Sequence, residues 1–441
     1  MPAFVRNILA NKEFMKYFHN FSWMLSEYVL KFFATFLISI YIARYLGPKD
    51  YGLLSYIITI VFFFMALSRL AMETTLVREL VKSPEKKNES ISTAFLLMLV
   101  GSIISILIAN IFAYVFETDP QIKLYVLILS AALIFQPFFV IDYNFQADLK
   151  AKYPSIAKSV ALFLSSIYKI YLVYYEFDFI YILVAYILDF FLISVFLYIF
   201  SLSKSPVKLF TQFSFLRAKR FLSSSLPLVF SSLSMYTFTM LDKLMIKQML
   251  GIKSLGYYSA STKIYEGWMF VPIIAIASLF PILIKFKKQS GSKYKTNLIR
   301  IFSFITWLGL IIAAISTIFR EEIIFYLFGS AYSKANTSLP ILMWAAAFIG
   351  MGTISYKYFS IENLEKKFLI RAIVSLATNF PLNLLLIPLY GINGAAFSTL
   401  VSVIISYYII DYFDPKTKEL FSMKNTAILL PFYKLIGKSP L

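Results

Sequence analysis

The chain of 441 residues contains no cysteine and a single histidine, His19. Disulfide scaffolds and thiolate chemistry are therefore excluded, and so are metal sites built from several histidines. Charged residues are scarce as well, at 15% of the sequence, whereas hydrophobic residues make up 59%. This composition predicts an integral membrane protein that crosses the bilayer many times.

Apolar runs of about 20 residues, long enough for a helix to cross a bilayer, recur along the whole chain. Twelve spans are expected, at residues 21–46, 51–80, 91–116, 122–142, 155–175, 179–201, 221–250, 256–284, 297–319, 338–360, 368–388 and 393–413. The predicted fold class is therefore an all-α membrane protein made of two six-helix bundles. The expected segments are an N-terminal segment 1–20, a bundle 21–201, a basic linker 202–220, a bundle 221–413 and a basic tail 414–441.

A short polar turn is used twice, about 200 residues apart. Residues 45–56 align with 249–260, and five of the twelve positions are identical. Of these, Gly47 and Gly251 are expected to end a helix, while Gly52 and Gly256 are expected where two helices approach closely. A turn repeated at the same place in each half predicts a parallel repeat, with a pseudo-two-fold axis along the membrane normal.

The basic residues of the loops predict the orientation. The N-terminal segment, the tail and every second connection carry 28 lysines and arginines, while the alternate connections carry five. By the positive-inside rule both termini are cytoplasmic. A net charge of +19 could indicate a nucleic-acid partner, but basic residues confined to short loops between spans exclude that reading.

Several charges remain within the spans, where each costs about 2.5–3.5 kcal/mol at a lipid-facing position. The candidate substrate-binding residues are Lys31, Arg44, Arg69, Lys169, Lys243 and Lys263. The candidate ion-coupling residues are Glu73, Asp189, Asp242 and Glu266. Two interpretations stay open for these charges, namely structural ion pairs and the charged wall of an aqueous cavity.

Spacing suggests which of these charges lie together. Glu27 and Lys31 are four residues apart, and so are Arg69 and Glu73, the spacing at which side chains meet on one helix. Asp242, Lys243, Lys263 and Glu266 fall at nearly one depth when counted from the second turn, and Lys169 faces Asp189 across two neighbouring spans.

Several segments resemble one known family. They are YIARYLGPKDYG at 41–52, VREL at 77–80, DKLMIKQMLG at 242–251, GYYSASTK at 256–263 and GINGAA at 391–396. They are similar to the bacterial polysaccharide flippases of O-antigen translocase type, in the multidrug, oligosaccharidyl-lipid and polysaccharide exporter superfamily. The similarity covers nearly the whole chain in order.

The resemblance implies transport of a polyprenyl-diphosphate-linked oligosaccharide repeat unit from the cytoplasmic to the outer leaflet by alternating access. It implies a multi-pass protein of the bacterial cytoplasmic membrane that serves surface polysaccharide or lipopolysaccharide biosynthesis. The expected partners are the lipid-linked oligosaccharide, the phospholipid bilayer and other membrane proteins of polysaccharide assembly. No phosphate-binding loop is present, so no cofactor is expected apart from a coupling proton or sodium ion.

Two alternatives use the same kind of chain. A multidrug cation antiporter of the same superfamily would share the architecture but would line its cavity with acidic and aromatic groups. A membrane polysaccharide polymerase or ligase would act on the same lipid-linked substrate. Such an enzyme usually needs a large external loop or an Asp-x-Asp metal pair, and the sequence offers neither, so an enzyme is not expected.

Overall fold

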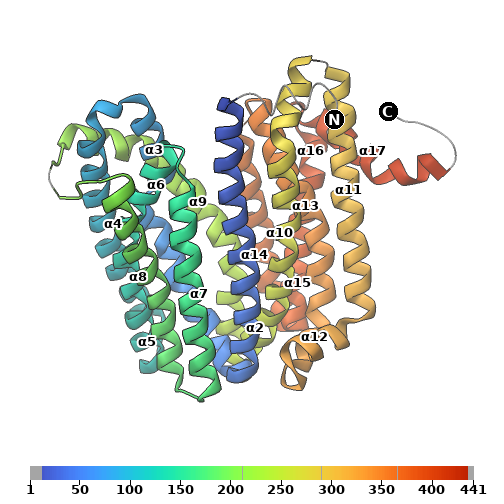
Figure 1. The fold of residues 1–441 in the computed structure, drawn as a ribbon. Coiled ribbons are helices and arrows are strands. Elements are labelled where there is room, and N and C mark those ends of the chain that lie inside the picture. The colour runs from blue at the N-terminus through green and yellow to red at the C-terminus, as the bar shows by residue number, and fades with distance from the viewer. Residues whose placement is uncertain (1–11, 211, 290, 365, 436–441) are drawn as a thin grey trace. The chain divides into compact units, whose positions relative to one another are not determined.

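A computed structural model describes residues 12–210, 212–289, 291–364 and 366–435 (Figure 1). All regular secondary structure in these ranges is helical. Nine helical stretches of the described chain are long and apolar enough to cross a membrane. The prediction of an all-helical protein with many membrane spans is therefore confirmed.

The chain forms two compact units. The first unit contains the residues up to Tyr45 together with Ile57–Leu233, and the second contains Leu46–Tyr56 and Ser234–Leu441. The first turn of the sequence repeat thus belongs to the same unit as the second turn.

The helices of the N-terminal half are α2 (Lys12–Arg69), α3 (Met72–Lys82), η1 (Pro84–Lys86), α4 (Lys87–Phe116), α5 (Pro120–Ser130), η2 (Ala131–Phe138), α6 (Phe139–Ala147), α7 (Lys152–Tyr174) and α8 (Phe179–Lys204). Local sequence explains several of their boundaries. The Asp119 carboxylate accepts a hydrogen bond from the Gln121 backbone amide at 2.8 Å, and Pro120 occupies the first helical position of α5. Both features favour a helix start at this point.

The helices of the C-terminal half are α9 (Phe215–Leu250), α10 (Ile252–Gln289), α11 (Gly291–Ile318), α12 (Arg320–Phe328), η3 (Ser330–Thr337), α13 (Ser338–Ile361), α14 (Lys366–Tyr390), α15 (Ile392–Ile404), the π-helix η4 (Ile405–Ile409), α16 (Ile410–Phe413) and α17 (Lys418–Leu435). Gly329 connects α12 to η3 with a φ of 89°. Glycine adopts this backbone conformation without a steric penalty, which explains the tight turn at that point.

The nine candidate spans account for ten of the twelve expected ones. The first, His19–Lys82, contains both the first and the second expected span. The expected seventh and eighth spans correspond to α9 and α10, with 36 and 38 residues, which are not among the nine. Six serines between positions 223 and 234 lower the hydropathy of α9, and several side chains of α10 lie outside the described ones.

The four glycines of the repeated turn have the predicted roles. Gly47 and Gly251 have φ values of 68° and 86°, so each ends one helical segment before the next begins. A Cβ on Gly52 would lie 2.1 Å from the Ile252 carbonyl oxygen, and one on Gly256 would lie 1.7 Å from the Pro48 carbonyl oxygen. The two copies of the turn therefore pack directly on each other, which the sequence alone did not predict.

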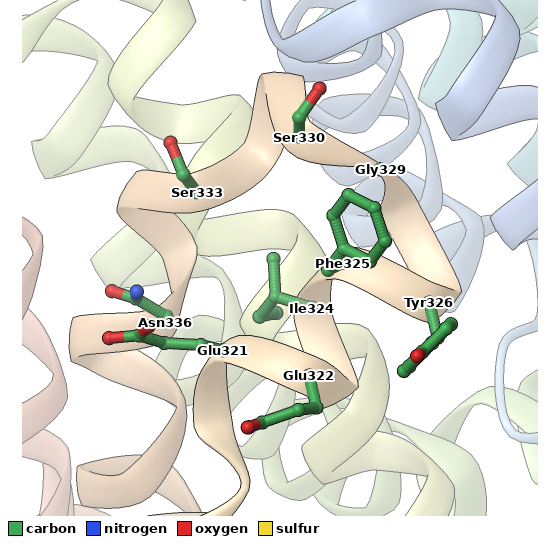
Figure 2. A pocket seen from close by; sticks show the side chains of 9 residues that line it. All are labelled: Glu321, Glu322, Ile324, Phe325, Tyr326, Gly329, Ser330, Ser333 and Asn336. Atoms are coloured by element: carbon green, nitrogen blue, oxygen red, sulfur yellow. The ribbon is translucent and has the colours of Figure 1, made fainter.

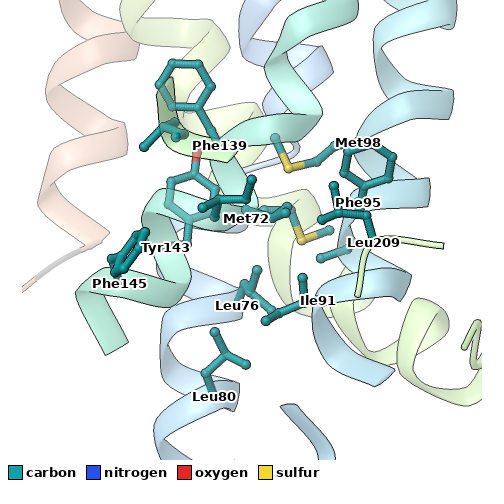
Figure 3. Packing of buried hydrophobic residues seen from close by; sticks show 14 of the residues in the cluster. Met72, Leu76, Leu80, Ile91, Phe95, Met98, Phe139, Tyr143, Phe145 and Leu209 are labelled. Atoms are coloured by element: carbon teal, nitrogen blue, oxygen red, sulfur yellow. The ribbon is translucent and has the colours of Figure 1, made fainter. Parts of the chain in front are cut away.

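A hydrophobic core in the first unit is built by α3, α4 and α6 (Figure 3). Side chains spaced three or four residues apart lie on one face of a helix, so each helix presents a continuous apolar stripe. The stripes are Met72, Leu76 and Leu80 on α3, Ile91, Phe95 and Met98 on α4, and Phe139 and Tyr143 on α6. Leu209 of the predicted linker completes this core, so part of the linker is packed within the first unit.

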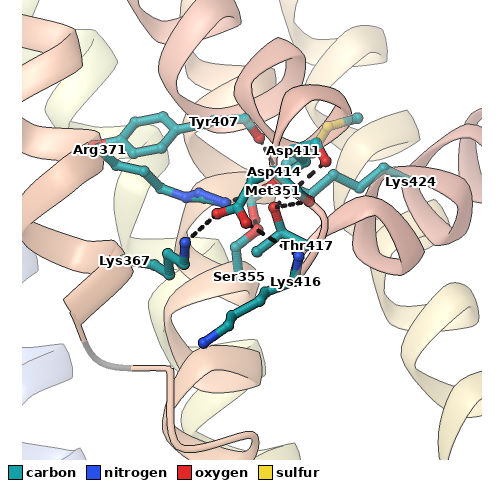
Figure 4. A network of polar contacts seen from close by, with 10 residues as sticks. All are labelled: Met351, Ser355, Lys367, Arg371, Tyr407, Asp411, Asp414, Lys416, Thr417 and Lys424. Atoms are coloured by element: carbon teal, nitrogen blue, oxygen red, sulfur yellow. Dashed lines mark hydrogen bonds and ion pairs between the residues drawn. The ribbon is translucent and has the colours of Figure 1, made fainter.

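The segment after the last expected span packs against the other helices of the second unit through a buried charge network (Figure 4). Lys424 of α17 is fully buried, and its Nζ lies 2.7 Å from Asp411 Oδ2 and 2.6 Å from the Tyr407 carbonyl oxygen. Asp411 also contacts the guanidinium of Arg371 on α14. Since burying a charge is costly unless it is paired, these contacts fix the position of α17 against the ends of α14 and α16.

Candidate functional site

A polar cavity of about 270 Å³ lies in the first unit, lined by residues of α2, α3, α6, α7 and α8. It brings together three residues that the sequence analysis singled out, Lys31, Arg69 and Glu73. The other charged lining residues are Glu27, Asp142 and Lys158. Part of the cavity wall is aromatic and is formed by Phe139, Tyr143 and Phe190. The cavity therefore combines charges of both signs with apolar surface.

The two predicted cations keep much of their hydrogen-bonding capacity free. Among the described residues, no carboxylate lies within ion-pair distance of the Lys31 ammonium or the Arg69 guanidinium. Arg69 donates from Nε to Gln136 Oε1 at 2.8 Å, and its guanidinium lies 5.0 Å from the centre of the Phe139 ring. These contacts orient Arg69 without neutralising it, so both cations are available to an anionic ligand.

The predicted pairing of Arg69 with Glu73 is wrong. The expectation assumed one continuous helix, but α2 ends at Arg69. Leu70 and Ala71 both have a φ of 49° before α3 begins. The two side chains are therefore not neighbours on one helical face, although both line the cavity.

Asp142, at the end of the expected fourth span, and Lys158 are the charged lining residues that sequence reasoning missed. Lys158 lies near a span end and was counted among the loop cations. Its Nζ lies 3.2 Å from Glu27 Oε2 and 2.9 Å from Asp142 Oδ2. Ser155 donates a further hydrogen bond to Glu27 at 3.3 Å. Glu27 therefore pairs with Lys158 across helices and not with Lys31 one turn away. The only sequence signal was the position of Lys158 within the expected fifth span.

Lys169 and Asp189 form the predicted contact between α7 and α8. Lys169 Nζ lies 2.5 Å from Asp189 Oδ2 and 4.4 Å from the centre of the Tyr186 ring. Neither charge lines the cavity. Arg44 is exposed and does not line it either. For Lys169 and Asp189 the geometry favours the interpretation as a structural ion pair.

This interpretation predicts a characteristic pattern of stabilities. Lys169→Met or Asp189→Leu alone is expected to lower the free energy of unfolding by about 2 kcal/mol, because each leaves a partly buried charge without its partner. The double variant is expected to stay within about 1 kcal/mol of the natural protein. Thermal unfolding in detergent measures all three. A double variant as unstable as the sum of the single variants would contradict the structural role.

Asp242 lies in a separate polar cluster of the second unit. Its side chain is 6% exposed. The carboxylate accepts hydrogen bonds from Tyr258 Oη at 2.7 Å, from Asn383 Nδ2 at 2.6 Å and from the Thr399 hydroxyl. Among the described residues, no lysine or arginine pairs with it. This is a buried carboxylate held by neutral groups, an arrangement that suits a bound cation or a proton.

The cluster also contains an unsatisfied polar atom. Asn383 Nδ2 donates to Asn379 Oδ1 at 2.9 Å, but Asn383 Oδ1 has no hydrogen-bond partner among the described residues. Buried polar atoms are rarely left without a hydrogen bond, and the exceptions often mark a place for water or an ion. Carboxylate, amide and hydroxyl oxygens are ligands that hard cations prefer.

The other three charges near Asp242 in the sequence form their own group. Glu266 lies 3.7 Å from Lys243 and 3.8 Å from Lys263. All three side chains are partly exposed, and Asp242 points away from them into its neutral cluster. Asp242 therefore does not join the other three charges in one cluster, because α9 directs the consecutive residues Asp242 and Lys243 to different faces.

Another hollow, about 370 Å³ in volume, belongs to the second unit and lies between α12 and η3 (Figure 2). Its polar lining consists of Glu321, Glu322, Ser330, Ser333 and Asn336. These side chains are exposed or half-buried, and none of the predicted site residues is among them. The cavity around Lys31 and Arg69 is therefore the better candidate site.

Comparisons with known proteins identify a family and support the fold. A family model described as polysaccharide biosynthesis protein matches residues 41–337. The capsular polysaccharide biosynthesis protein CapF of Staphylococcus aureus is 26% identical over 414 residues, which covers 88% of this chain and 98% of CapF.

Solved structures share the fold at low sequence identity. The lipid II flippase MurJ in an inward closed conformation has a TM-score of 0.68 at 14% identity, covering 96% of this chain and 94% of MurJ. An inward-facing multidrug resistance MATE family transporter of the MOP superfamily also has a TM-score of 0.68, at 13% identity, covering 90% of this chain and 96% of the transporter. Since the family model spans well over half of its residues, the chain belongs to the polysaccharide biosynthesis protein family.

Proposed function

We propose that this protein carries a polyprenyl-diphosphate-linked oligosaccharide repeat unit from the cytoplasmic to the outer leaflet of the bacterial cytoplasmic membrane. Transport proceeds by alternating access of two six-helix bundles, with both termini in the cytoplasm. The product serves a surface polysaccharide, of which a capsule or an O-antigen is an example. The names of CapF, a capsular polysaccharide protein, and of MurJ, a lipid II flippase, support this assignment.

The observation that carries the proposal is the pair of unneutralised cations, Lys31 and Arg69, in one cavity. A diphosphate brings negative charge that must leave water, and charge-assisted hydrogen bonds from an ammonium and a guanidinium offset that cost. The prenyl chain can stay in the lipid, so only the headgroup has to cross. The apolar wall formed by Phe139 and Phe190 suits the part of the ligand nearest the prenyl chain.

Lys243 and Lys263 stay predictions as further contacts for the substrate. Each lies near Glu266 at a distance close to 4 Å, and all three side chains are partly exposed. Such loose, wet pairs contribute little to stability and can exchange their carboxylate for a phosphate. Roles for Arg44 and Lys169 in binding the substrate are less well supported, because Arg44 is exposed away from the cavity and Lys169 is paired.

Asp242 is our proposal for the coupling site of a proton or sodium ion. The support is its burial, its neutral hydrogen-bond donors and the Asn383 amide oxygen beside it, which has no partner among the described residues. The other acidic candidates are less suitable, since Asp189 and Glu266 lie against lysines, and Glu73 is exposed in the cavity wall. A cation at Asp242 would compensate a buried charge that no lysine or arginine of the described chain neutralises.

The proposed function is tested by reconstituting the protein in vesicles with a polyprenyl-diphosphate-linked oligosaccharide in one leaflet. The natural protein is expected to move it to the other leaflet. Lys31→Ala with Arg69→Ala should slow translocation at least about 100-fold, since two charge-assisted hydrogen bonds are lost. Arg78→Ala is the matched control, because Arg78 is an exposed cation that does not line the cavity.

Two results would contradict the proposal. One is the absence of translocation by the natural protein both with and without proton and sodium gradients. The other is an unchanged rate in the double variant. The same vesicles, loaded with a lipophilic cation, test the alternative of a multidrug antiporter, which the carboxylates Glu27, Glu73 and Asp142 in the cavity wall keep open.

A further inference from the structure

The charges that line the cavity cancel one another. The wall contains three cations, Lys31, Arg69 and Lys158, and three carboxylates, Glu27, Glu73 and Asp142. Net charge therefore does not explain why an anion would be preferred. What matters is which of these charges are already engaged within the protein and which are left to face a ligand.

Lys158 engages two of the three carboxylates. Its ammonium lies between Glu27 on α2 and Asp142 on α6, at 3.2 and 2.9 Å. All three side chains are largely buried, with exposures of 18%, 13% and 6%. An ion pair shielded from water in this way is screened little by salt, so Lys158 offsets one of the two negative charges and holds one oxygen of each carboxylate away from a ligand. Two cations and Glu73 are then left to face the ligand.

We infer that Lys158 is the specificity-determining residue that makes this cavity select anions over lipophilic cations. Without its ammonium, Glu27 and Asp142 would stand together and uncompensated in a cavity with aromatic walls, and the lining would carry a net negative charge. Carboxylates beside aromatic rings are the groups that attract an organic cation. The inference deepens the proposed function and rests on it for the anionic nature of the natural substrate.

The preference of the cavity for anions or cations is measured by the affinities of two probes for the purified full-length protein. The probes are tetraphenylphosphonium, a lipophilic cation, and farnesyl diphosphate, a short polyprenyl diphosphate. Lys158→Gln is expected to bind the cation about tenfold more tightly and the diphosphate about tenfold more weakly, which is about 1.4 kcal/mol in each case. Lys158→Arg, which keeps the charge, should bind both probes like the natural protein.

Lys152→Gln is the matched control for the loss of a lysine charge. Lys152 lies on the same helix, is exposed, stands 5.7 Å from the centre of the Trp23 ring and does not line the cavity. It is expected to leave both affinities within about twofold. Glu27→Gln in the Lys158→Gln background removes one uncompensated carboxylate, so the gain in cation binding should disappear.

A second variant keeps Lys158 and removes its two carboxylate partners instead. It tests the same inference even if Lys158→Gln folds poorly. Glu27→Gln with Asp142→Asn frees the ammonium, so farnesyl diphosphate should bind about tenfold more tightly. Unchanged affinities in Lys158→Gln and in this variant would overturn the inference. Cation binding that persists after Glu27→Gln would overturn it too.

The outcome separates this inference from the proposed function. If the natural protein binds no diphosphate but Lys158→Gln gains cation binding, Lys158 controls whether the cavity accepts cations, and the proposed substrate is wrong. If the natural protein binds the diphosphate and Lys158→Gln does so equally well, without gaining cation affinity, the proposed substrate stands and Lys158 does not determine specificity.

Discussion

Replacing Gly256 with alanine is expected to prevent recovery of folded protein. An added Cβ would lie 1.7 Å from the Pro48 carbonyl oxygen and 2.6 Å from its carbonyl carbon. These are backbone atoms, which cannot rotate away as the end of a side chain can. Overpacking of side chains typically costs about 1–3 kcal/mol, and a clash between two backbones is expected to exceed that range. Size-exclusion chromatography and thermal unfolding in detergent measure the effect.

The same reasoning applies to Gly52, whose added Cβ would lie 2.1 Å from the Ile252 carbonyl oxygen. Gly291 is the matched control, since its φ is not in the left-handed region and nothing lies within 4 Å of an added Cβ. Gly291→Ala should therefore fold normally. Full recovery of stable Gly256→Ala would mean that the two turns do not pack as closely as described.

Replacing Asp242 with asparagine is expected to abolish the dependence of transport on an ion gradient and to slow transport about 100-fold, as losses at ion-binding sites reach about 10–100-fold. Asparagine has nearly the same shape as aspartate, and Tyr258 and Thr399 can still donate to its oxygen. The fold should therefore be kept. What is lost is the negative charge that a proton or sodium ion would balance.

Vesicle translocation measured with and without proton and sodium gradients tests this expectation. Glu85→Gln serves as the control, because Glu85 is an exposed carboxylate in the short helix η1 and lies outside both polar sites. Thr399→Val, which removes one hydrogen bond to Asp242, should give an intermediate loss of about tenfold. Gradient-dependent transport by Asp242→Asn at the natural rate would remove Asp242 from the coupling mechanism.

Local features of the fold were predictable where one residue type satisfies one physical demand. Gly47 and Gly251 were expected to end helices, and both have positive φ. The contact of Lys169 with Asp189 was expected from the register of two neighbouring spans, and it forms. The spacing of Arg69 and Glu73 gave a wrong prediction because the helix does not continue between them. The break at Leu70 and Ala71, two residues that rarely adopt positive φ, has no signal in the sequence.

The candidate site was predictable in part. Lys31 and Arg69 were identified because a cation in a span must pair or face a polar cavity, and its place in a span can be read from the sequence. Lys158 was missed because its role depends on Glu27 and Asp142, which lie on other helices. Asp242 was identified as a charge, but its neutral partners Asn383 and Thr399 are more than 140 residues away in the chain.

The sequence by itself determined the class of protein, the repeated turn and the set of charges that need a polar environment, because composition, glycine conformation and the cost of charge in lipid are properties of single residues and short segments. Only the tertiary structure decided which of these charges neutralise each other. Ion pairs form between side chains whose atoms come within about 4 Å, and the packing of distant helices, not their order in the chain, sets that distance. For this reason Lys31 and Arg69 have no carboxylate partner among the residues that the structure describes, while Lys158 is engaged by Glu27 and Asp142.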